Sequence, residues 1–518
     1  MSSHVRGDCF THELPLVLLG HQERELDVAF DTARQAYNAL LGESLRRLDL
    51  LRERKQYRRA LKLRGRSKAR AFNELRSEIG FSQFELHTWA SRHLTTTWLA
   101  EHLDATVVRS LSERAFRATQ QHAFGKRGRP RFRGRNMLDS IEGQSNRQGL
   151  RYDAGSITWN GASFPVPRSY RVELDDGTRT KYALSHRVVR VRIVRRRLGS
   201  KVRYWMQLVL AGRPYQDPNT VQRTGTVGVD PGPRIFAILS DQLAARVDLS
   251  VSLEVGRRAL RRYQRSLERK LGKAPGRGRR SAAARRERDR LADAYRRAAA
   301  TRRNLHGRLA NAVLTLGNEI HVEHNNIRSF QRSFGRSITN AAPAAFILLL
   351  ERKAANAGVR FARIPVTMRL SQTCHGCGVI QKKPLAQRIH RCACGVEAQR
   401  DIYSALLLAY LVPTRCKPGW RLDADLLSQR WSGVRSRLPA ASSPLSIDAL
   451  VAEIEQTARC AQRGARPVKG IERFAGAVSA KRCEARDVVA DEARARESIA
   501  GSEPVQSRAS RVTADTFV

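Results

Sequence analysis

Residues 226–240 read TVGVDPGPRIFAILS and decide the fold of the second half of the chain. The apolar run Thr226–Val229 is typical of a buried strand. The triplet Asp230-Pro231-Gly232 predicts a turn, and Ile235–Ser240 predicts a second strand after it. Asp230 is therefore expected where an apolar strand ends.

The chain on the C-terminal side of this stretch continues with alternating helices and strands. Two further strands are predicted at Glu319–Glu323 and Val359–Pro365, with a helix near Ala341–Ala357 between them. Two long, Arg-rich helices are expected at Leu253–Leu271 and Arg285–Leu314, and the segment KAPGRGRR at 273–280 is expected to form a hinge between them. Strands that alternate with helices indicate an α/β core.

Three carboxylates stand at strand ends or at a helix start. Asp230 ends one apolar strand, Glu323 ends another, and Asp401 begins the apolar helix RDIYSALLLAYL. If they converge, their hard oxygen ligands suit two Mg²⁺ ions that support phosphodiester hydrolysis. Taken singly, each has an ordinary alternative: a turn residue, a solvated loop start, or a helix N-cap.

Four cysteines cluster within a short segment as C-x-x-C and C-x-C pairs: Cys374, Cys377, Cys392 and Cys394. Such pairs suit a tetrahedral Zn²⁺ ion in a small knuckle that has no core of its own. Because the second pair is one residue shorter than usual, His375 or His390 could replace one sulfur. Packed reduced cysteines are the alternative, and disulfides are the least favoured one.

The first half of the chain predicts a basic helical lobe followed by a small sheet or barrel. A strand is expected at Leu14–Leu19, a helix around Val28–Leu41, a basic helix over Arg46–Arg76, and a helical stretch over Phe81–Gln120. After the break GKRGRPRFRG (125–134), strands are expected at Ser156–Trp159, Ser163–Val166, Arg187–Val194 and Tyr204–Leu210.

Charge identifies the class of partner. The 518 residues include 95 Lys or Arg and 48 Asp or Glu, a net charge of +47 that indicates a polyanionic partner such as nucleic acid.

No stretch is long and apolar enough to cross a bilayer, and no secretion signal is evident, so a cytoplasmic protein without membrane contact is expected. Residues 413–518 are weakly patterned and predict marginal helices, the best at Ser446–Arg459, with disordered chain.

Arginines dominate the candidate nucleic-acid contacts, because guanidinium groups bind phosphate in a bidentate manner. The alternative is a solvated, charged surface. The candidates are Arg129, Arg131, Arg133, Arg190, Arg192, Arg258, Arg262, Arg265, Arg269, Arg277, Arg279 and Arg280.

Taken together, these segments resemble a known family. TVGVDPG, then IHVEHNNI, then RLSQTCHGCG…RCACG…RDIYSALL are similar, over about residues 224–412, to the split RuvC-type nuclease domain of TnpB. TnpB is the transposon-encoded OrfB protein, ancestral to the type V CRISPR effectors. ARQAYNALL (33–41) and RGRPRFRG (127–134) match the family more loosely. The sequence departs from it at His324, at Tyr403 in place of Asn, and in the C-x-C pair.

The resemblance implies a multidomain α+β protein, namely an RNA-guided DNA endonuclease with an RNase H-like, RuvC-type α/β domain. Asp230, Glu323 and Asp401 would be its Mg²⁺-binding catalytic residues, and the four cysteines would hold one structural Zn²⁺. Guide RNA and single- or double-stranded target DNA would be its partners, with the protein reading a short adjacent DNA motif. A monomer with one RNA and a homodimer are both open.

The implied domains follow the chain in order. They are a first strand of a wedge-like β domain (1–20), a helical recognition lobe (21–122), the wedge-like β domain (123–222), the RuvC-type core (223–370 and 398–412), a target-nucleic-acid-binding zinc knuckle inserted in it (371–397), and a C-terminal extension (413–518). Two other functions stay open: a cleavage-inactive RNA-guided repressor, and a strand-transfer transposase or resolvase on the same fold.

Overall fold

The computed structural model divides the chain into two compact units, residues 1–215 and 216–518. Each unit is described by itself. The structure describes residues 8–93, 96–161, 168–199, 201–216, 224–251, 254–271, 281–325, 331, 334–335, 338–384, 386–414, 419–436, 438 and 443–462. The expected strand at 163–166 and the expected hinge at 273–280 lie outside these residues. Among the described helices, none combines the length and the apolar character that a bilayer crossing requires.

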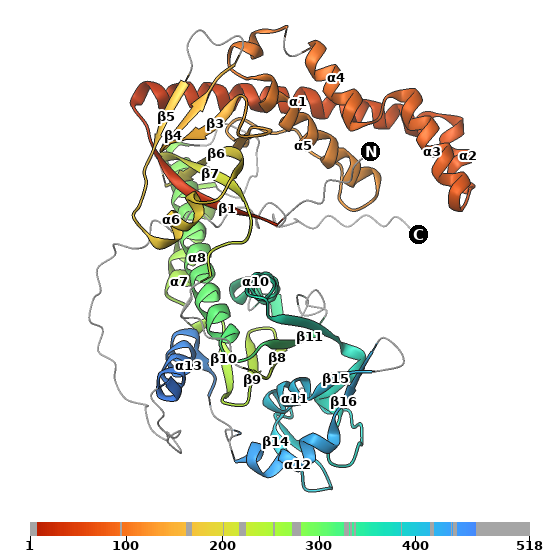
Figure 1. Ribbon diagram of the computed structural model, residues 1–518, viewed down its shortest axis with the longest axis vertical. Coiled ribbons are helices and arrows are strands. Elements are labelled where there is room, and N and C mark those ends of the chain that lie inside the picture. The colour runs from red at the N-terminus through yellow and green to blue at the C-terminus, as the bar shows by residue number, and fades with distance from the viewer. Residues whose placement is uncertain are drawn as a thin grey trace. The chain divides into compact units, whose positions relative to one another are not determined.

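The first unit combines helices with a seven-stranded sheet (Figure 1). Its helices are α1 (Gly20–Glu53), α2 (Lys55–Lys62), α3 (Gly65–Ile79), α4 (Gln83–His93), α5 (Ala105–Ala123) and α6 (Thr178–Leu184). The strand order is β2-β6-β7-β1-β5-β4-β3. The strands are β1 (Cys9–Val17), β2 (Ser140–Glu142), β3 (Leu150–Asp153), β4 (Ser156–Trp159), β5 (Arg168–Val172), β6 (Val188–Leu198) and β7 (Lys201–Ala211).

One hydrophobic core holds helices and sheet of this unit together. Phe30 and Leu40 of α1 are fully buried in the same cluster as Trp159 of β4 and Met206 of β7. This burial is explained by the apolar stripe of α1, which recurs at helical spacing and needs an apolar surface to cover it. The helical segment and the β segment thus share one core.

Helix boundaries in this unit differ from the predicted ones. The basic stretch Arg46–Arg76 is not one helix, because α1 ends at Glu53 and α2 and α3 follow as separate helices. The stretch Phe81–Gln120 is also divided, and α5 begins anew where Asp104 accepts hydrogen bonds from the backbone N–H groups of Thr106 and Val107. Apolar residues at helical spacing indicate which face of a helix is buried, but they do not show where one helix ends and the next begins.

The second unit is built on a mixed six-stranded sheet in the order β12-β11-β8-β9-β10-β17. Neighbouring strands β8, β9 and β10 are antiparallel, whereas β11 is parallel to β8, β12 to β11 and β17 to β10. The strands are β8 (Thr226–Pro231), β9 (Ile235–Leu239), β10 (Ala244–Asp248), β11 (Glu319–His324), β12 (Arg360–Pro365) and β17 (Leu445–Ser446).

Helices cover both faces of this sheet. On one face, α8 (Ala282–Leu314), α10 (Pro343–Ala357) and α13 (Ile447–Gln462) share a core with Val227 and Val229. On the other face, α11 (Arg400–Ala409) packs with Ala237 and Leu239. The remaining elements are α7 (Glu254–Leu271), α12 (Ala424–Arg435), and the strand pairs β13 (Ile389–Arg391) with β14 (Glu397–Gln399) and β15 (Leu411–Pro413) with β16 (Trp420–Leu422).

The segment after residue 413 is more integrated than the sequence predicts. Strand β17 pairs with β10, and Ile447, Leu450 and Ile454 of α13 are buried in the core under the sheet. The helix predicted at Ser446–Arg459 is confirmed as α13, but it is a core element and not a marginal helix. Its apolar stripe is short, and only the tertiary partner α8, far away in sequence, shows that it is a core element.

Helix α11 crosses strand β8 at contact distance, at a glycine. A Cβ atom on Gly228 would lie 1.8 Å from the carbonyl oxygen of Ala405 and 3.0 Å from the backbone nitrogen of Ala409. These are backbone atoms of α11, which cannot move aside as a flexible side chain would. Only glycine therefore allows this crossing.

Gly228→Ala is expected to destabilise the full chain by about 3 kcal/mol, because overpacking forces the helix away from the sheet. Urea denaturation measures this change. Gly307→Ala is the matched control, since Gly307 lies in α8 and no atom stands within 4 Å of its added Cβ. That variant should keep or slightly raise stability, because alanine favours a helix. Equal stability of the two variants would contradict the tight crossing.

Candidate metal centres

The three acidic residues singled out in the sequence come together on the α11 face of the six-stranded sheet. In β8, Val227 and Val229 face the opposite core, so Gly228 and Asp230 face α11, because strand side chains alternate. Continuing the parallel register of β8 with β11, where Val229 pairs with Val322, places Glu323 beside Asp230. Both residues therefore lie at the same level of one face.

Asp401 reaches this face from α11. It occupies the first turn of that helix, and the crossing of α11 over β8 brings its carboxylate within electrostatic range of Asp230. Gln399 caps the same helix: its Oε1 accepts from the Ile402 backbone N–H at 2.8 Å, and its Nε2 donates to Asp401 Oδ2 at 3.2 Å. The cap thus also orients the Asp401 side chain.

Burial and neighbouring negative charges shift the pKa values of the carboxyl groups at this centre. Burial, followed by the negative charges of Glu323 and Asp401, raises the pKa of Asp230 well above its usual range. Burial also raises the pKa of Glu323, although Asn325 opposes the shift by donating a hydrogen bond of 2.9 Å to Glu323 Oε2. A hydrogen bond between the two carboxyl groups adds to the rise in the pKa of Asp230 and opposes the rise in the pKa of Glu323.

This donor set fits a divalent cation. Carboxylate oxygens are the ligands that Mg²⁺ prefers, and the positive charge of a cation would relieve the repulsion among three neighbouring carboxylates. Asn325 also donates to the carbonyl oxygen of Pro231 at 3.2 Å, which ties the turn after Asp230 to the end of β11. Asp230, Glu323 and Asp401 are therefore the residues that could hold the ion.

One basic residue at this centre escaped the sequence analysis. Arg246 of β10 pairs with Ala237, which in turn pairs with Asp230, so all three lie in line across the sheet. Its Nε lies 3.6 Å from Asp401 Oδ2. The available signal was the alternation of β10, which places Arg246 on the opposite face from the buried Ala245 and Val247.

The four cysteines form a second centre. The sulfurs of Cys374 and Cys394 are 3.5 Å apart, those of Cys377 and Cys392 are 3.4 Å apart, and all four lie within 4.8 Å of one another. Four convergent thiols of this kind could hold a zinc ion. The pKa of Cys392 falls to about 7, chiefly because the Cys394 backbone N–H donates to it, so its thiolate is available at neutral pH.

Neither nearby histidine completes the group. His375 meets the Tyr403 hydroxyl through both its backbone N–H (2.9 Å) and its Nδ1 (2.8 Å). His390 contacts Lys383 Nζ with its Nδ1 and lies against the Tyr403 ring, with centroids 4.2 Å apart. Of the alternatives that the sequence left open, the arrangement favours four cysteines as the ligands.

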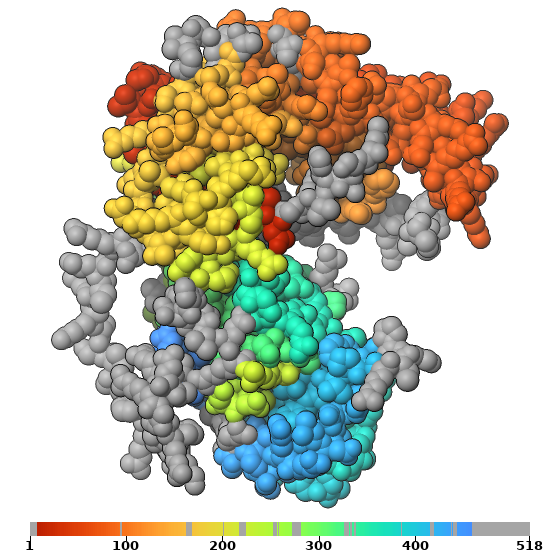
Figure 2. Space-filling model, viewed as in Figure 1, coloured from red at the N-terminus to blue at the C-terminus, as the bar shows by residue number. Residues whose placement is uncertain are grey.

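Tyr403 joins the cysteine knuckle to α11. It is fully buried, lies two residues after Asp401, and packs with Trp431 of α12 as well as with the two histidines. In Figure 2 the blue atoms of α12 lie against the teal atoms of the segments before it, in keeping with this shared core. Tyr403 thus fills the space between α11 and the cysteine knuckle.

Several predicted nucleic-acid contacts are engaged within the protein. Arg190 and Arg192 both pair with Glu142, at 2.7 and 3.2 Å, and Arg192 also donates to Gln207. Arg129 pairs with Asp49 at 2.8 Å but keeps about half of its side chain exposed. The sequence pattern of this strand did not reveal Glu142 on the neighbouring strand β2.

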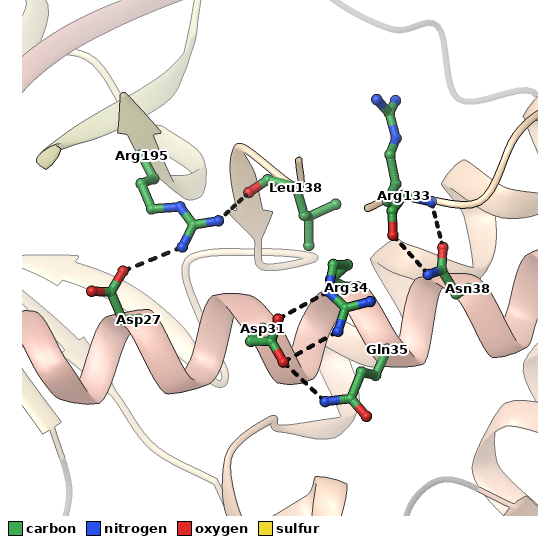
Figure 3. A network of polar contacts seen from close by, with 8 residues as sticks. All are labelled: Asp27, Asp31, Arg34, Gln35, Asn38, Arg133, Leu138 and Arg195. Carbon is green, nitrogen blue, oxygen red and sulfur yellow. Dashed lines mark hydrogen bonds and ion pairs between the residues drawn. The ribbon is translucent and has the colours of Figure 1, made fainter. Parts of the chain in front are cut away.

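Other arginines are displayed to solvent. Asn38 holds the backbone of Arg133 by two hydrogen bonds, of 2.8 and 2.9 Å, while the guanidinium points away from α1 (Figure 3). Arg131 is likewise exposed. An exposed face of α7 at helical spacing carries Arg258, Arg262, Arg265 and Arg269. Arg277, Arg279 and Arg280 lie outside the described residues.

Comparison with known proteins supports the resemblance. Residues 344–408, which contain the four cysteines and Asp401, match the family model described as Cas12f1-like, TNB domain. Over this part, the chain resembles a TnpB- and Cas12f-like family, as the sequence predicts. No curated protein matches the chain.

Two solved structures are similar to the chain at low identity. A Cas12f1–sgRNA–target DNA complex is 11% identical with a TM-score of 0.48, covering 77% of this chain and 98% of that one. A CRISPR–Cas12f ternary complex is 13% identical with a TM-score of 0.29, covering 78% and 84%.

Cys392→Ser is expected to abolish stoichiometric zinc binding, because three thiolates and a hydroxyl bind zinc far more weakly than four thiolates. Elemental analysis of the purified full chain should give about one zinc per wild-type chain and much less for the variant. Cys9→Ser, at an exposed cysteine in the first unit, is the control and should retain the zinc. Equal zinc content in all three proteins would contradict the knuckle.

Asp230→Asn is expected to stabilise the zinc-loaded chain in magnesium-free buffer at neutral pH. Because the folded pKa of Asp230 is raised, the folded state binds more protons than the unfolded state between pH 4 and that pKa, and wild-type stability falls as pH rises through this window. The gain from asparagine should therefore vanish as pH falls towards about 4. Urea denaturation across pH measures it.

Asp293, a carboxylate whose pKa is lowered and not raised, provides the control. Burial tends to raise the pKa of Asp293 in α8, but hydrogen bonds and charges from Arg296 and Arg297 outweigh this and lower it. Asp293→Asn should therefore destabilise the chain at neutral pH, and its effect should fade as pH falls below about 4. A destabilising Asp230→Asn substitution at pH 7 would contradict the buried acidic cluster.

Proposed function

We propose that the chain is an RNA-guided DNA endonuclease that hydrolyses phosphodiester bonds of target DNA at a Mg²⁺-dependent, RuvC-type centre. The observation that carries the proposal is the convergence of Asp230, Glu323 and Asp401 on one face of a mixed sheet. The Cas12f1-like match over residues 344–408 supports an RNA-guided role in DNA binding or cleavage. The high net positive charge suits two nucleic-acid partners.

The sheet supports the fold assignment. Three consecutive antiparallel strands, β8, β9 and β10, followed by the parallel strands β11 and β12 beside β8, are the arrangement we expect of an RNase H-like domain. We assign residues 223–370 and 398–412 to this RuvC-type core and 371–397 to an inserted, target-nucleic-acid-binding zinc knuckle. The helices of 21–122 would form the recognition lobe, and the strands of 1–20 and 123–222 the wedge-like domain that reads a DNA motif.

The residues of the centre have distinct tasks. Asp230, Glu323 and Asp401 would hold two Mg²⁺ ions, which in such sites activate a water and stabilise the leaving 3′ oxygen. Asn325 orients Glu323 through its hydrogen bond, and Gln399 orients Asp401. Both orienting amides keep the carboxylates aimed at the shared space, which lowers the cost of assembling the site.

Nucleic acid would be held by exposed arginines. Arg131 and Arg133 in the first unit and Arg258, Arg262, Arg265 and Arg269 on α7 are displayed to solvent and suit RNA or DNA phosphates. Arg190 and Arg192 are engaged with Glu142 and are weaker candidates. Guide RNA pairing would then supply sequence recognition, while the protein contacts the backbone.

Asp230→Ala is expected to reduce guided DNA cleavage by at least about 10³-fold while leaving RNA affinity unchanged, because the substitution removes a metal ligand and no phosphate-binding group. Sequencing the RNA that co-purifies with the full chain supplies the guide. A matched plasmid with Mg²⁺ then reports cleavage, and a filter assay reports RNA binding.

Asp425→Ala, at an exposed acidic residue in the first turn of α12, is the matched control and should cleave normally. Wild-type protein that binds the guided target without cutting it would favour the repressor alternative. Absence of a defined co-purifying RNA would instead favour a transposase or resolvase. Near wild-type cutting by Asp230→Ala would refute the assigned centre.

A further inference from the structure

Arg246 faces the acidic centre from the third strand of the sheet. The antiparallel registers Asp230↔Ala237 and Ala237↔Arg246 put the three residues in one row on one face. Ala237 in the middle is small and buried, so the long Arg246 side chain has room to lie across it towards the centre. The arginine is thus built into the same face as the three carboxylates.

The guanidinium group of Arg246 lies beside the carboxylate of Asp401. Its Nε lies 3.6 Å from Asp401 Oδ2, and the Arg246 side chain is only 15% exposed. Oδ2 is also the oxygen to which Gln399 donates. A partly buried cation beside a cluster of carboxylates interacts more strongly than a surface ion pair, because less water screens it.

We infer that Arg246 is a positioning residue of this centre that competes with the divalent cation for Asp401. This inference rests on the proposed function. The guanidinium supplies positive charge to Asp401 when no divalent cation is bound, and it lowers the affinity of the centre for that cation. The nuclease centre would therefore be weakly occupied at low cation concentrations, and Arg246 would set the concentration that it requires.

A purely structural role predicts the opposite result. If Arg246 only buttressed Asp401, its removal would loosen a ligand and weaken cation binding. If it competes, removing its charge should strengthen binding, by about tenfold for a unit charge within about 6 Å of a divalent ion, even at the dielectric constant of water. The sign of the change therefore distinguishes the two roles.

The experiment titrates Mn²⁺, as a paramagnetic probe, into the zinc-loaded full chain without nucleic acid and follows free Mn²⁺ by electron paramagnetic resonance. Arg246→Gln is expected to lower the Mn²⁺ dissociation constant about tenfold. Arg246→Met, which keeps the aliphatic stem, should do the same and serves if the glutamine variant does not fold. Arg246→Lys retains the charge and should bind nearly as the wild type does.

Arg360→Gln is the matched control. Arg360 also pairs with a carboxylate on this sheet, Glu319, at 2.7 Å, but Glu319 begins β11 whereas Glu323 lies near its other end. The Arg360→Gln substitution should therefore leave the Mn²⁺ affinity unchanged. Suppose that the wild type binds Mn²⁺ and that Asp230→Asn does not. Unchanged or weaker Mn²⁺ binding in both Arg246→Gln and Arg246→Met would then overturn the role of Arg246 and leave the proposed centre standing. Wild-type binding that is absent, or that survives Asp230→Asn, would overturn the proposed centre as well.

Discussion

The absence of a side chain at Gly228 is the constraint on which the second unit depends. Because nothing separates β8 from α11, the backbone of Ala405 rests directly on the strand. This short separation sets the height of the whole helix above the sheet. Asp401, one turn from the crossing, is thereby lowered to the level of Asp230 and Glu323. A side chain at position 228 would hold the helix, and with it that carboxylate, farther from the sheet.

The same helix couples the acidic centre to the cysteine knuckle. Asp401 and Tyr403 are two residues apart on α11, and the Tyr403 hydroxyl meets both the backbone N–H and the ring of His375, which adjoins Cys374. A knuckle with so small a core depends on its metal for order. Zinc bound there would therefore also fix the first turn of α11, so a structural ion and a catalytic carboxylate would share one support.

Strands β8, β9, β11 and β12 and helices α7, α8, α10 and α11 could be predicted from sequence because each carries a local pattern, whereas β10, α12 and the short strand pairs were not predicted. Arg246 could not, since its role depends on a register with Ala237 and Asp230 that only the folded sheet defines. The ion pairs of Arg190 and Arg192 could not be predicted for a similar reason, because their partner Glu142 lies on a strand distant in sequence. Helix α13 has an apolar stripe, but its burial depends on contact with α8, which the local sequence pattern does not show.

The acidic centre is unfavourable for the fold that contains it. Burial raises the pKa of Asp230 and of Glu323, and neighbouring negative charges add to the rise at Asp230, so ionising this centre costs free energy that the packing of both sheet faces has to offset. Ordinary turn or capping roles for Asp230 and Asp401 would not require them to meet, and either role could be filled without burial. Arg246 beside Asp401, and the charge of Arg400 acting on Asp230, reduce the repulsion without eliminating it, since the pKa of Asp230 is still raised. A site that binds further positive charge is the arrangement that explains all four residues together.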